Sequence, residues 1–123
     1  MKAILRLICQ AAEKYEELIS QKNKESYLLL KKLDFFKELI KKDESYGEPI
    51  RKNNLTKNRK LLNMFFQRYD YRELYNLDNC YCCDLTRTEW RMLYTLMKDK
   101  NEDILYILCF MIIDHKTYEK YFT

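Results

Sequence analysis

The sequence predicts an all-α protein, folded as a single-domain bundle of five to six helices. The 123 residues contain one Gly and one Pro, Gly47 and Pro49. Average usage gives about nine Gly and six Pro, and a protein of several β-hairpins needs such residues at its turns. Val is absent and Thr is scarce, whereas Leu, Lys, Glu and Met, which lose little side-chain freedom in a helix, are abundant.

The first half of the chain has two apolar stripes at helical spacing. One runs from Ile4 to Ile19 and predicts a helix over residues 2–20. A polar stretch over 21–26 follows, and the same period then resumes as far as Lys42, with Asn23 as a candidate N-cap. We therefore predict an N-terminal αα-hairpin. A single rod of residues 2–42 is the alternative, because no residue in the polar stretch breaks a helix.

A loop over 43–49 separates the helices of residues 1–42 from those of 50–123. Pro49 suits the first position of the next helix, a basic one whose apolar stripe ends near Tyr69. Asp70 and Glu73 have the spacing of a capping box, which predicts a short helix to about residue 77. A polar, Cys-rich connector over 78–84 follows.

The last two predicted helices are the most strongly marked. Thr86 and Glu89 form a second capping box, which predicts a helix to about Lys98. Asn101 then caps a helix over 102–121, whose apolar run from 104 to 113 makes it the central helix of the bundle. This run has half of the ~20 residues that span a bilayer. We accordingly expect no membrane partner.

The five cysteines favour a reducing compartment, the cytosol or, for a viral protein, the nucleus, because their number is odd and no regular disulfide spacing appears. We also predict no signal peptide, since Arg6 interrupts the first apolar stretch. Cys80 and Cys83 have the spacing of a zinc knuckle, but no second paired knuckle exists. The expectation is therefore no metal and no cofactor, with a small zinc protein as a minor alternative.

Catalytic signatures are missing from the sequence. No nucleophile elbow and no glycine-rich phosphate loop occur, and the paired carboxylates lie in Lys-rich surroundings. His115, the only histidine, is better explained by the negative end of a helix dipole than by catalysis. We therefore predict that the protein is not an enzyme.

Two surface features remain as candidate sites. Residues 51–72 carry seven basic residues against one Asp, more than the net charge of +4 of the whole chain. The candidate nucleic-acid contacts there are Arg51, Lys52, Lys57, Arg59 and Lys60. The chain also has 11 Tyr, too many to bury in one small core, and Tyr and Arg are enriched in protein interfaces. The candidate protein-binding residues are Arg68, Tyr69, Tyr71, Arg72, Tyr75 and Tyr81.

These features predict a non-enzymatic regulator or inhibitor that docks on a larger protein or nucleoprotein complex. Lys, Asn, Ile, Tyr and Phe are plentiful while Gly, Ala, Pro and Val are scarce, a bias typical of AT-rich genomes such as those of many viruses and phages. A viral or phage-encoded anti-defence or host-modulating protein is the most concrete version of this expectation. The alternative is a nucleic-acid-binding helical protein, or a small subunit of a nucleoprotein complex, that uses residues 51–72. Partner identity and oligomeric state stay open.

Overall fold

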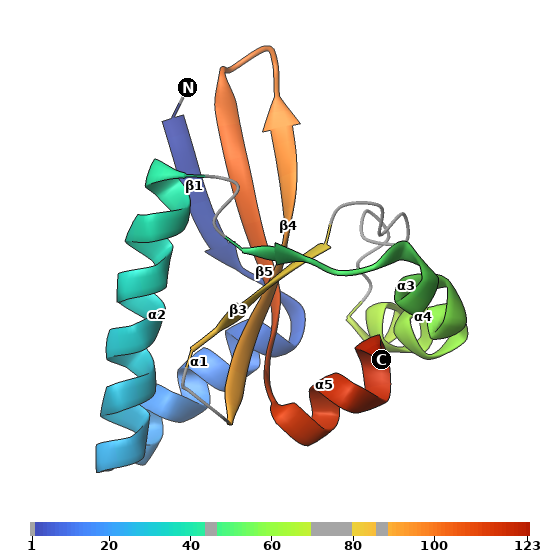
Figure 1. Cartoon of the computed structure of the whole chain (residues 1–123). Coiled ribbons are helices and arrows are strands. Elements are labelled where there is room, and N and C mark those ends of the chain that lie inside the picture. Colours follow the sequence, from blue (N-terminus) through green and yellow to red (C-terminus); the bar gives the residue numbers. More distant parts are fainter. Residues whose placement is uncertain (1, 44–46, 70–79, 86–88) are drawn as a thin grey trace.

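The computed structural model has a five-stranded mixed sheet at its centre, so the prediction of an all-α helical bundle is wrong (Figure 1). The structure describes residues 2–43, 47–69, 80–85 and 89–123. The strand order across the sheet is β1-β5-β4-β3-β2. β1 runs parallel to β5, and the other neighbouring pairs are antiparallel.

The chain has five strands and five helices in its described residues. They are β1 (Lys2–Leu7), α1 (Cys9–Gln21), α2 (Lys24–Lys42), β2 (Glu48–Pro49), α3 (Lys52–Lys57), α4 (Arg59–Arg68), β3 (Cys80–Asp84), β4 (Trp90–Asp99), β5 (Ile104–Asp114) and α5 (His115–Phe122).

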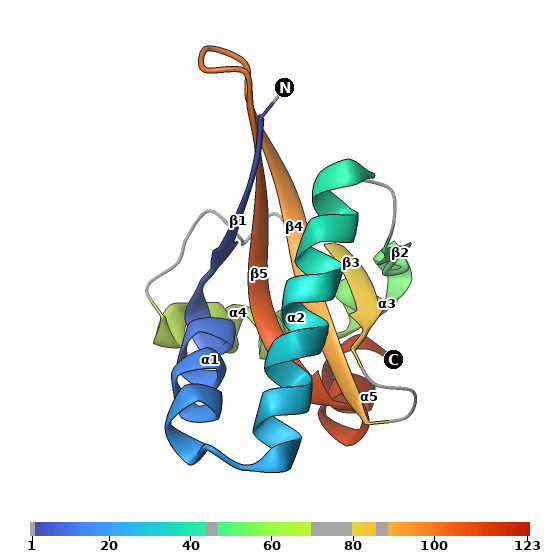
Figure 2. The ribbon, with the colours of Figure 1, turned by 90° about the vertical axis from the view of Figure 1, so that its left-hand side faces the viewer.

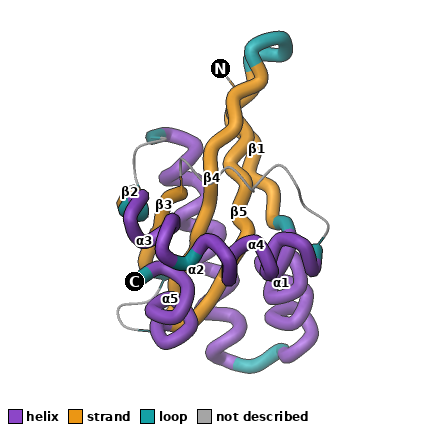
Figure 3. The backbone as a smooth tube through the Cα atoms, turned by 90° about the vertical axis from the view of Figure 1, so that its right-hand side faces the viewer, coloured by secondary structure: helices purple, strands orange, loops and turns teal. Residues whose placement is uncertain are grey.

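Helices cover both faces of the sheet and create two cores. The first core joins one face to α1 and α2, with Ala11, Leu18 and Leu33 buried in it. The second core joins the opposite face to α3, α4 and α5 and includes Leu62 and Phe66 of α4. Figure 2 shows α1 and α2 in front of the sheet, and Figure 3 shows the β4–β5 hairpin projecting beyond the helices. Among the described helices, none has the length and apolarity that a membrane span requires.

β5 lies between these two cores, where the sequence predicts a central helix. Its residues from Ile107 to Ile113 are buried without interruption, because helices pack on both faces of the sheet. A strand covered on both faces shows a continuous apolar run instead of an alternating one. Such a run has no period that separates a strand from a buried helix. The prediction of a helix over 102–121 is therefore correct only for the segment that forms α5.

The turn between β4 and β5 explains how the chain builds a hairpin without glycine. The Asp99 side chain accepts hydrogen bonds from the backbone N–H groups of Asn101, at 3.0 Å, and of Glu102, at 3.3 Å. Asp103 takes a left-handed conformation with φ 53°, which Asp tolerates better than most residues. The predicted helix ending at Lys98 is wrong, since residues 90–99 form β4.

The predicted break at Asn23 is confirmed. The Asn23 side chain accepts a hydrogen bond from the backbone N–H of Ser26 at 2.8 Å and so caps α2. Lys22, directly before it, is left-handed with φ 47° and ends α1. The single rod over 2–42 is therefore wrong. The first helix also begins later than predicted, at Cys9, because residues 2–7 form β1.

The segment after the first two helices also differs from the prediction. Pro49 lies in β2 and does not begin a helix. The basic helix expected to end near Tyr69 is two helices, α3 and α4, which meet at Asn58. Residues 80–84 of the predicted connector form β3. The short helix predicted from Asp70 lies outside the described residues.

Candidate functional site

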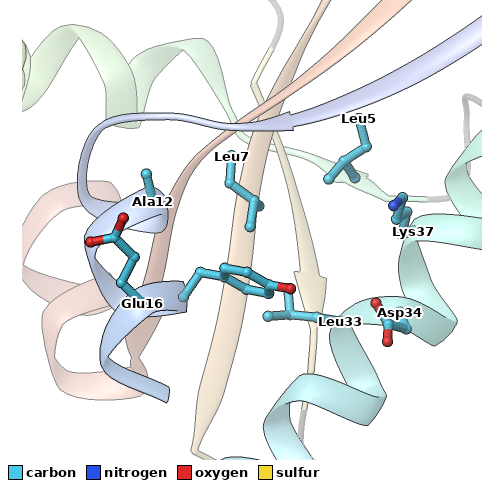
Figure 4. Close-up of a pocket in the computed structure, with 8 residues that line it drawn as sticks. Leu5, Leu7, Ala12, Glu16, Leu33, Asp34 and Lys37 are labelled. Atoms are coloured by element: carbon cyan, nitrogen blue, oxygen red, sulfur yellow. The ribbon is translucent and has the colours of Figure 1, made fainter. Parts of the chain in front are cut away.

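A groove lies beside β1, on the face of the sheet that α1 and α2 cover. Its volume is about 360 Å³, and the residues that line it are Leu5, Leu7, Ala12, Tyr15, Glu16, Leu33, Asp34 and Lys37. Figure 4 shows Leu5 and Leu7 projecting from β1 toward the helices, while Glu16 on one side and Asp34 and Lys37 on the other flank the opening. The groove thus has an apolar floor and charged residues at its opening.

The alternation of side chains along β1 produces this floor. Successive side chains of a strand point to opposite faces of the sheet. Ala3, Leu5 and Leu7 accordingly pack against the first core. Lys2 and Arg6 are exposed, and the same alternation places them on the other face. The guanidinium carbon of Arg6 lies 4.9 Å from the centre of the Tyr106 ring, a cation–π contact that holds its side chain over β5.

β1 is also an edge strand with one open side. The backbone N–H of Lys2 donates to the Asp103 carbonyl at 3.1 Å, and that of Ile8 donates to the Cys109 carbonyl at 2.9 Å. Backbone groups alternate along a strand, so the even-numbered residues bond toward β5 and Ala3, Leu5 and Leu7 direct their N–H and C=O groups away from it. Within the described part of the chain, β5 is the only strand that pairs with β1.

The two helices that line the groove also carry exposed apolar side chains. Tyr15 is 36% exposed, and Ile19, one turn later on α1, is 48% exposed. Tyr27 of α2 is 57% exposed and lies seven residues before Asp34, on the same side of the helix. We call Tyr15, Ile19 and Tyr27 the groove rim. Tyr15 lines the groove, and Ile19 and Tyr27 lie on the same two helices, nearer to the connection between them.

The members of the predicted protein-binding set that the structure describes, Arg68, Tyr69 and Tyr81, do not gather on one face. Arg68 is exposed at the end of α4, and its guanidinium carbon lies 5.5 Å from the centre of the Tyr69 ring. The Tyr69 hydroxyl donates a hydrogen bond to the Glu13 carboxylate at 2.9 Å, linking α4 to α1. Burial and this contact with Glu13 raise the pKa of Tyr69 to about 12.

Tyr81 lies across the sheet from these two residues. Its ring stacks on that of Tyr94, with 5.5 Å between the ring centres, and packs against the first core. Phe65, which contacts Tyr69, packs against the second core. The other predicted members of this set, Tyr71, Arg72 and Tyr75, lie outside the described residues.

The predicted nucleic-acid-binding residues lie on two helices. Arg51, Lys57, Arg59 and Lys60 are exposed. Lys52 is the first residue of α3, and Arg59 begins α4. The break at Asn58 separates these two residues, so they do not belong to one continuous helix.

The cysteine pair does not have the geometry of a zinc knuckle. Cys80 and Cys82 are buried in the second core, whereas Cys83 is buried in the first. Cys80 and Cys83 lie three positions apart on a strand and therefore point to opposite faces. Among the described residues, no group of three or more His, Cys, Asp or Glu side chains is placed to hold a metal ion. Burial raises the pKa of Cys109 far above its ordinary value.

His115 begins α5 instead of lying in its last turns, so its predicted contact with the negative end of a helix dipole is wrong. Its Nε2 atom lies 2.9 Å from the Glu119 carboxylate, and its side chain is 45% exposed. This pair is a surface contact within one helix.

Comparison of the chain with protein-family models, with curated proteins and with solved structures finds no match. The groove is not predicted from the sequence because the apolar stripe from Ile4 to Ile19 places the residues of β1 in a helix. One signal was present in the sequence: residues 3–8 are apolar except for Arg6, a segment of the length typical of strands, and helical periodicity over so few residues does not exclude a strand.

Proposed function

We propose that this protein is a non-enzymatic protein-binding module that regulates or inhibits a larger protein or nucleoprotein complex. Its binding surface is the groove with the groove rim. The observation that carries the proposal is the open edge of β1 beside an apolar groove. An exposed sheet edge supplies main-chain hydrogen bonds to a partner, and neighbouring pockets for its side chains supply specificity.

The chemistry of the groove supports binding over catalysis. The residues that line it include no Ser, Thr, Cys or His. Its two carboxylates, Glu16 and Asp34, are exposed to solvent. The volume of about 360 Å³ lies near the lower limit for small-molecule sites and suits a few side chains of a partner.

The exposed groove rim adds to this argument. Tyr is over-represented among the residues that dominate binding energy in interfaces, and Tyr27 is more than half exposed. Four of the five cysteines are buried without a disulfide, in keeping with a reducing cytosol, or the nucleus if the protein is viral. An anti-defence or host-modulating role remains our most concrete version of the function, on the composition of the sequence.

Site-specific photo-crosslinking tests this function. A photoreactive phenylalanine analogue replaces Ile19 in the groove rim and, as a matched control, Met64, which is 59% exposed on α4. In cells that naturally contain the protein, we expect a discrete crosslinked partner from position 19, and none from position 64. In an affinity pull-down without the photoreactive residue, Ile19→Glu should weaken capture of that partner at least tenfold. Crosslinking from position 64 alone, or from neither position, would contradict the proposal.

Direct nucleic-acid binding is the second candidate, supported by the exposed side chains of Arg51, Lys57, Arg59 and Lys60. Six phosphate contacts imply a loss of affinity of about a thousandfold between 50 and 200 mM salt. We expect the purified protein to bind DNA or RNA weakly and without sequence preference. Tight binding at 150 mM salt that disappears when Arg51, Lys52, Arg59 and Lys60 lose their charges would favour this candidate instead.

A further inference from the structure

We propose that β1 accepts an extended segment of a partner protein as a sixth strand of the sheet, and that this segment alternates apolar with acidic residues. The inference rests on the proposed function, since it specifies how the groove takes its partner. It follows from three observations on β1: the direction of its backbone groups, the side on which its apolar side chains lie, and the charges on its other side.

The same residues present both the backbone groups and the groove floor. Ala3, Leu5 and Leu7 direct their N–H and C=O groups to the open side, and their side chains pack on the groove face. A strand added there places every second side chain above that face. Its apolar residues then reach the floor formed by Leu5, Leu7 and Leu33 while its backbone is hydrogen-bonded.

The charges on the opposite face of β1 favour acidic residues at every second position of the partner segment. Lys2 and Arg6 lie there, four residues apart on β1, and both are exposed. The contact with Tyr106 fixes the position of the Arg6 side chain before a partner arrives. Acidic side chains opposite these two residues form favourable cross-strand pairs. The net charge of +4 also attracts an acidic segment at longer range.

A second copy of this chain is a poorer occupant of the same edge. When β1 pairs antiparallel with another β1 in the register centred on Ile4, Lys2 of each copy faces Arg6 of the other. In the register centred on Leu5, Arg6 faces Ile4, and the Arg6 side chains of the two copies are diagonal neighbours, within reach of each other. Like charges directly opposite each other destabilise a sheet. Lys and Arg on an edge strand are also a common protection against self-association. The charges that oppose a second copy are those that favour an acidic strand.

The other edge of the sheet does not offer the same site. β2 contributes two residues, and Pro49, one of them, has no backbone N–H to donate. β1 contributes six residues. Strand addition is therefore assigned to β1.

Synthetic peptides test the inference on the whole protein. The probe is a blocked octapeptide that alternates leucine with glutamate, and the matched control has lysine in place of each glutamate. We expect the glutamate peptide to bind at least tenfold more tightly than the lysine peptide by NMR titration. On saturation, amide exchange of Ala3 and Leu5 should slow at least tenfold, while exchange of Ile4 and Arg6, whose N–H groups already bond to β5, stays unchanged. Equal binding of both peptides, or binding without this protection, would overturn the inference.

One variant removes the edge hydrogen bond and spares the groove. Ala3→Pro deletes an N–H group that points away from β5, a position where proline is compatible with an edge strand. Its control, Ala3→Ser, keeps the N–H group. Circular dichroism checks that both variants fold. We then expect the proline variant to lose peptide affinity at least tenfold and the serine variant to keep it within about twofold. If Ala3→Pro does not fold, an octapeptide N-methylated at the residues that face β1 provides the same test, with the same expected loss.

Two further outcomes separate this inference from the proposed function. A concentration-dependent dimer that Ala3→Pro abolishes would overturn the inference in favour of a second copy. If neither peptide binds but position 19 still crosslinks a partner, strand addition is wrong and the proposed function stands. If peptide binding follows the expected pattern and no partner is crosslinked, the edge binds acidic strands and the regulatory function is wrong.

Discussion

Gly47 is placed where no side chain fits. A Cβ atom on this residue would lie 2.1 Å from the hydroxyl oxygen of Tyr94. Its backbone N–H donates a hydrogen bond to that hydroxyl at 2.9 Å, and Tyr94 is fully buried. The only glycine of the chain thus serves a close approach of backbone to side chain. Gly47 does not form a hairpin turn. The number of glycines therefore does not indicate whether the fold contains strands.

Gly47→Ala tests this contact. The added methyl group forces Tyr94 or the backbone to move and weakens their hydrogen bond. We expect a loss of at least about 2 kcal/mol in the free energy of unfolding, as for overpacked cores. Urea denaturation measures it, with Glu48→Ala at the exposed neighbouring position as the control. A change below about 0.5 kcal/mol would show that Gly47 is not packed against Tyr94.

Ionisation of Tyr69 lowers the stability of the folded protein at alkaline pH. Its pKa is raised from an ordinary value near 10 to about 12 in the folded protein. The protonated form is therefore favoured by folding, so its contribution is complete below pH 10 and is lost as the pH rises through 12. Tyr69→Phe removes this titration and the hydrogen bond to Glu13. In urea unfolding at pH 8 and pH 11, we expect the variant to lose less stability between the two values than the wild type. An equal loss would contradict the contact.

At the scale of elements, unusual backbone conformations at ordinary residues replace glycine at the ends of helices and in turns. Cys9, Lys22 and Asp103 all have positive φ. A left-handed conformation costs an L-residue about 1–2 kcal/mol, a cost that glycine avoids. The tight connections that the composition seemed to exclude are therefore present in the fold.

Lys22→Gly should stabilise the protein for this reason. We expect a gain of about 0.5–1 kcal/mol, because relief of the left-handed strain exceeds the greater flexibility that glycine gives the unfolded chain. Lys31→Gly, at an exposed position within α2, should instead cost about 1 kcal/mol. Thermal unfolding of both variants measures the difference. A lower melting temperature for Lys22→Gly would contradict the conformation of the α1–α2 connection.

The sequence predicts local features of the fold and misses those that depend on distant pairing. Asn23 is identified as a cap because its partner, Ser26, is three residues away. β5 is assigned to a helix because a strand covered on both faces has no alternation. Of its two neighbours in the sheet, β4 is its hairpin partner, whereas β1 comes from the other end of the sequence. The sequence also fails to predict β1, because its partner strand is distant in the sequence. Its pairing with β5 joins residues more than 100 positions apart, such as Lys2 and Ile104.

At the scale of the molecule, the proposed binding site lies at the edge of the sheet that is less protected against the addition of another strand. β2 is short and contains proline, while β1 offers six residues, an adjoining groove and two basic side chains. The groove draws on residues from β1, α1 and α2, which only the fold brings together. The described members of the basic and aromatic sets that stand out in the sequence lie on or next to α3, α4 and β3, and the binding roles of both sets stay predictions.

The central claim is that residues 2–7 form an edge strand with one open side, and amide hydrogen exchange in the free protein tests it most directly. We expect slow exchange at Ile4 and Arg6, which bond toward β5, and fast exchange at Ala3 and Leu5, which point to the open side. Uniform protection would mean that both sides of β1 are paired. Protection of every amide from residue 6 onward, continuous with α1, is the pattern expected of helical i to i−4 hydrogen bonds. It would mean that residues 2–7 belong to a helix and would contradict the account.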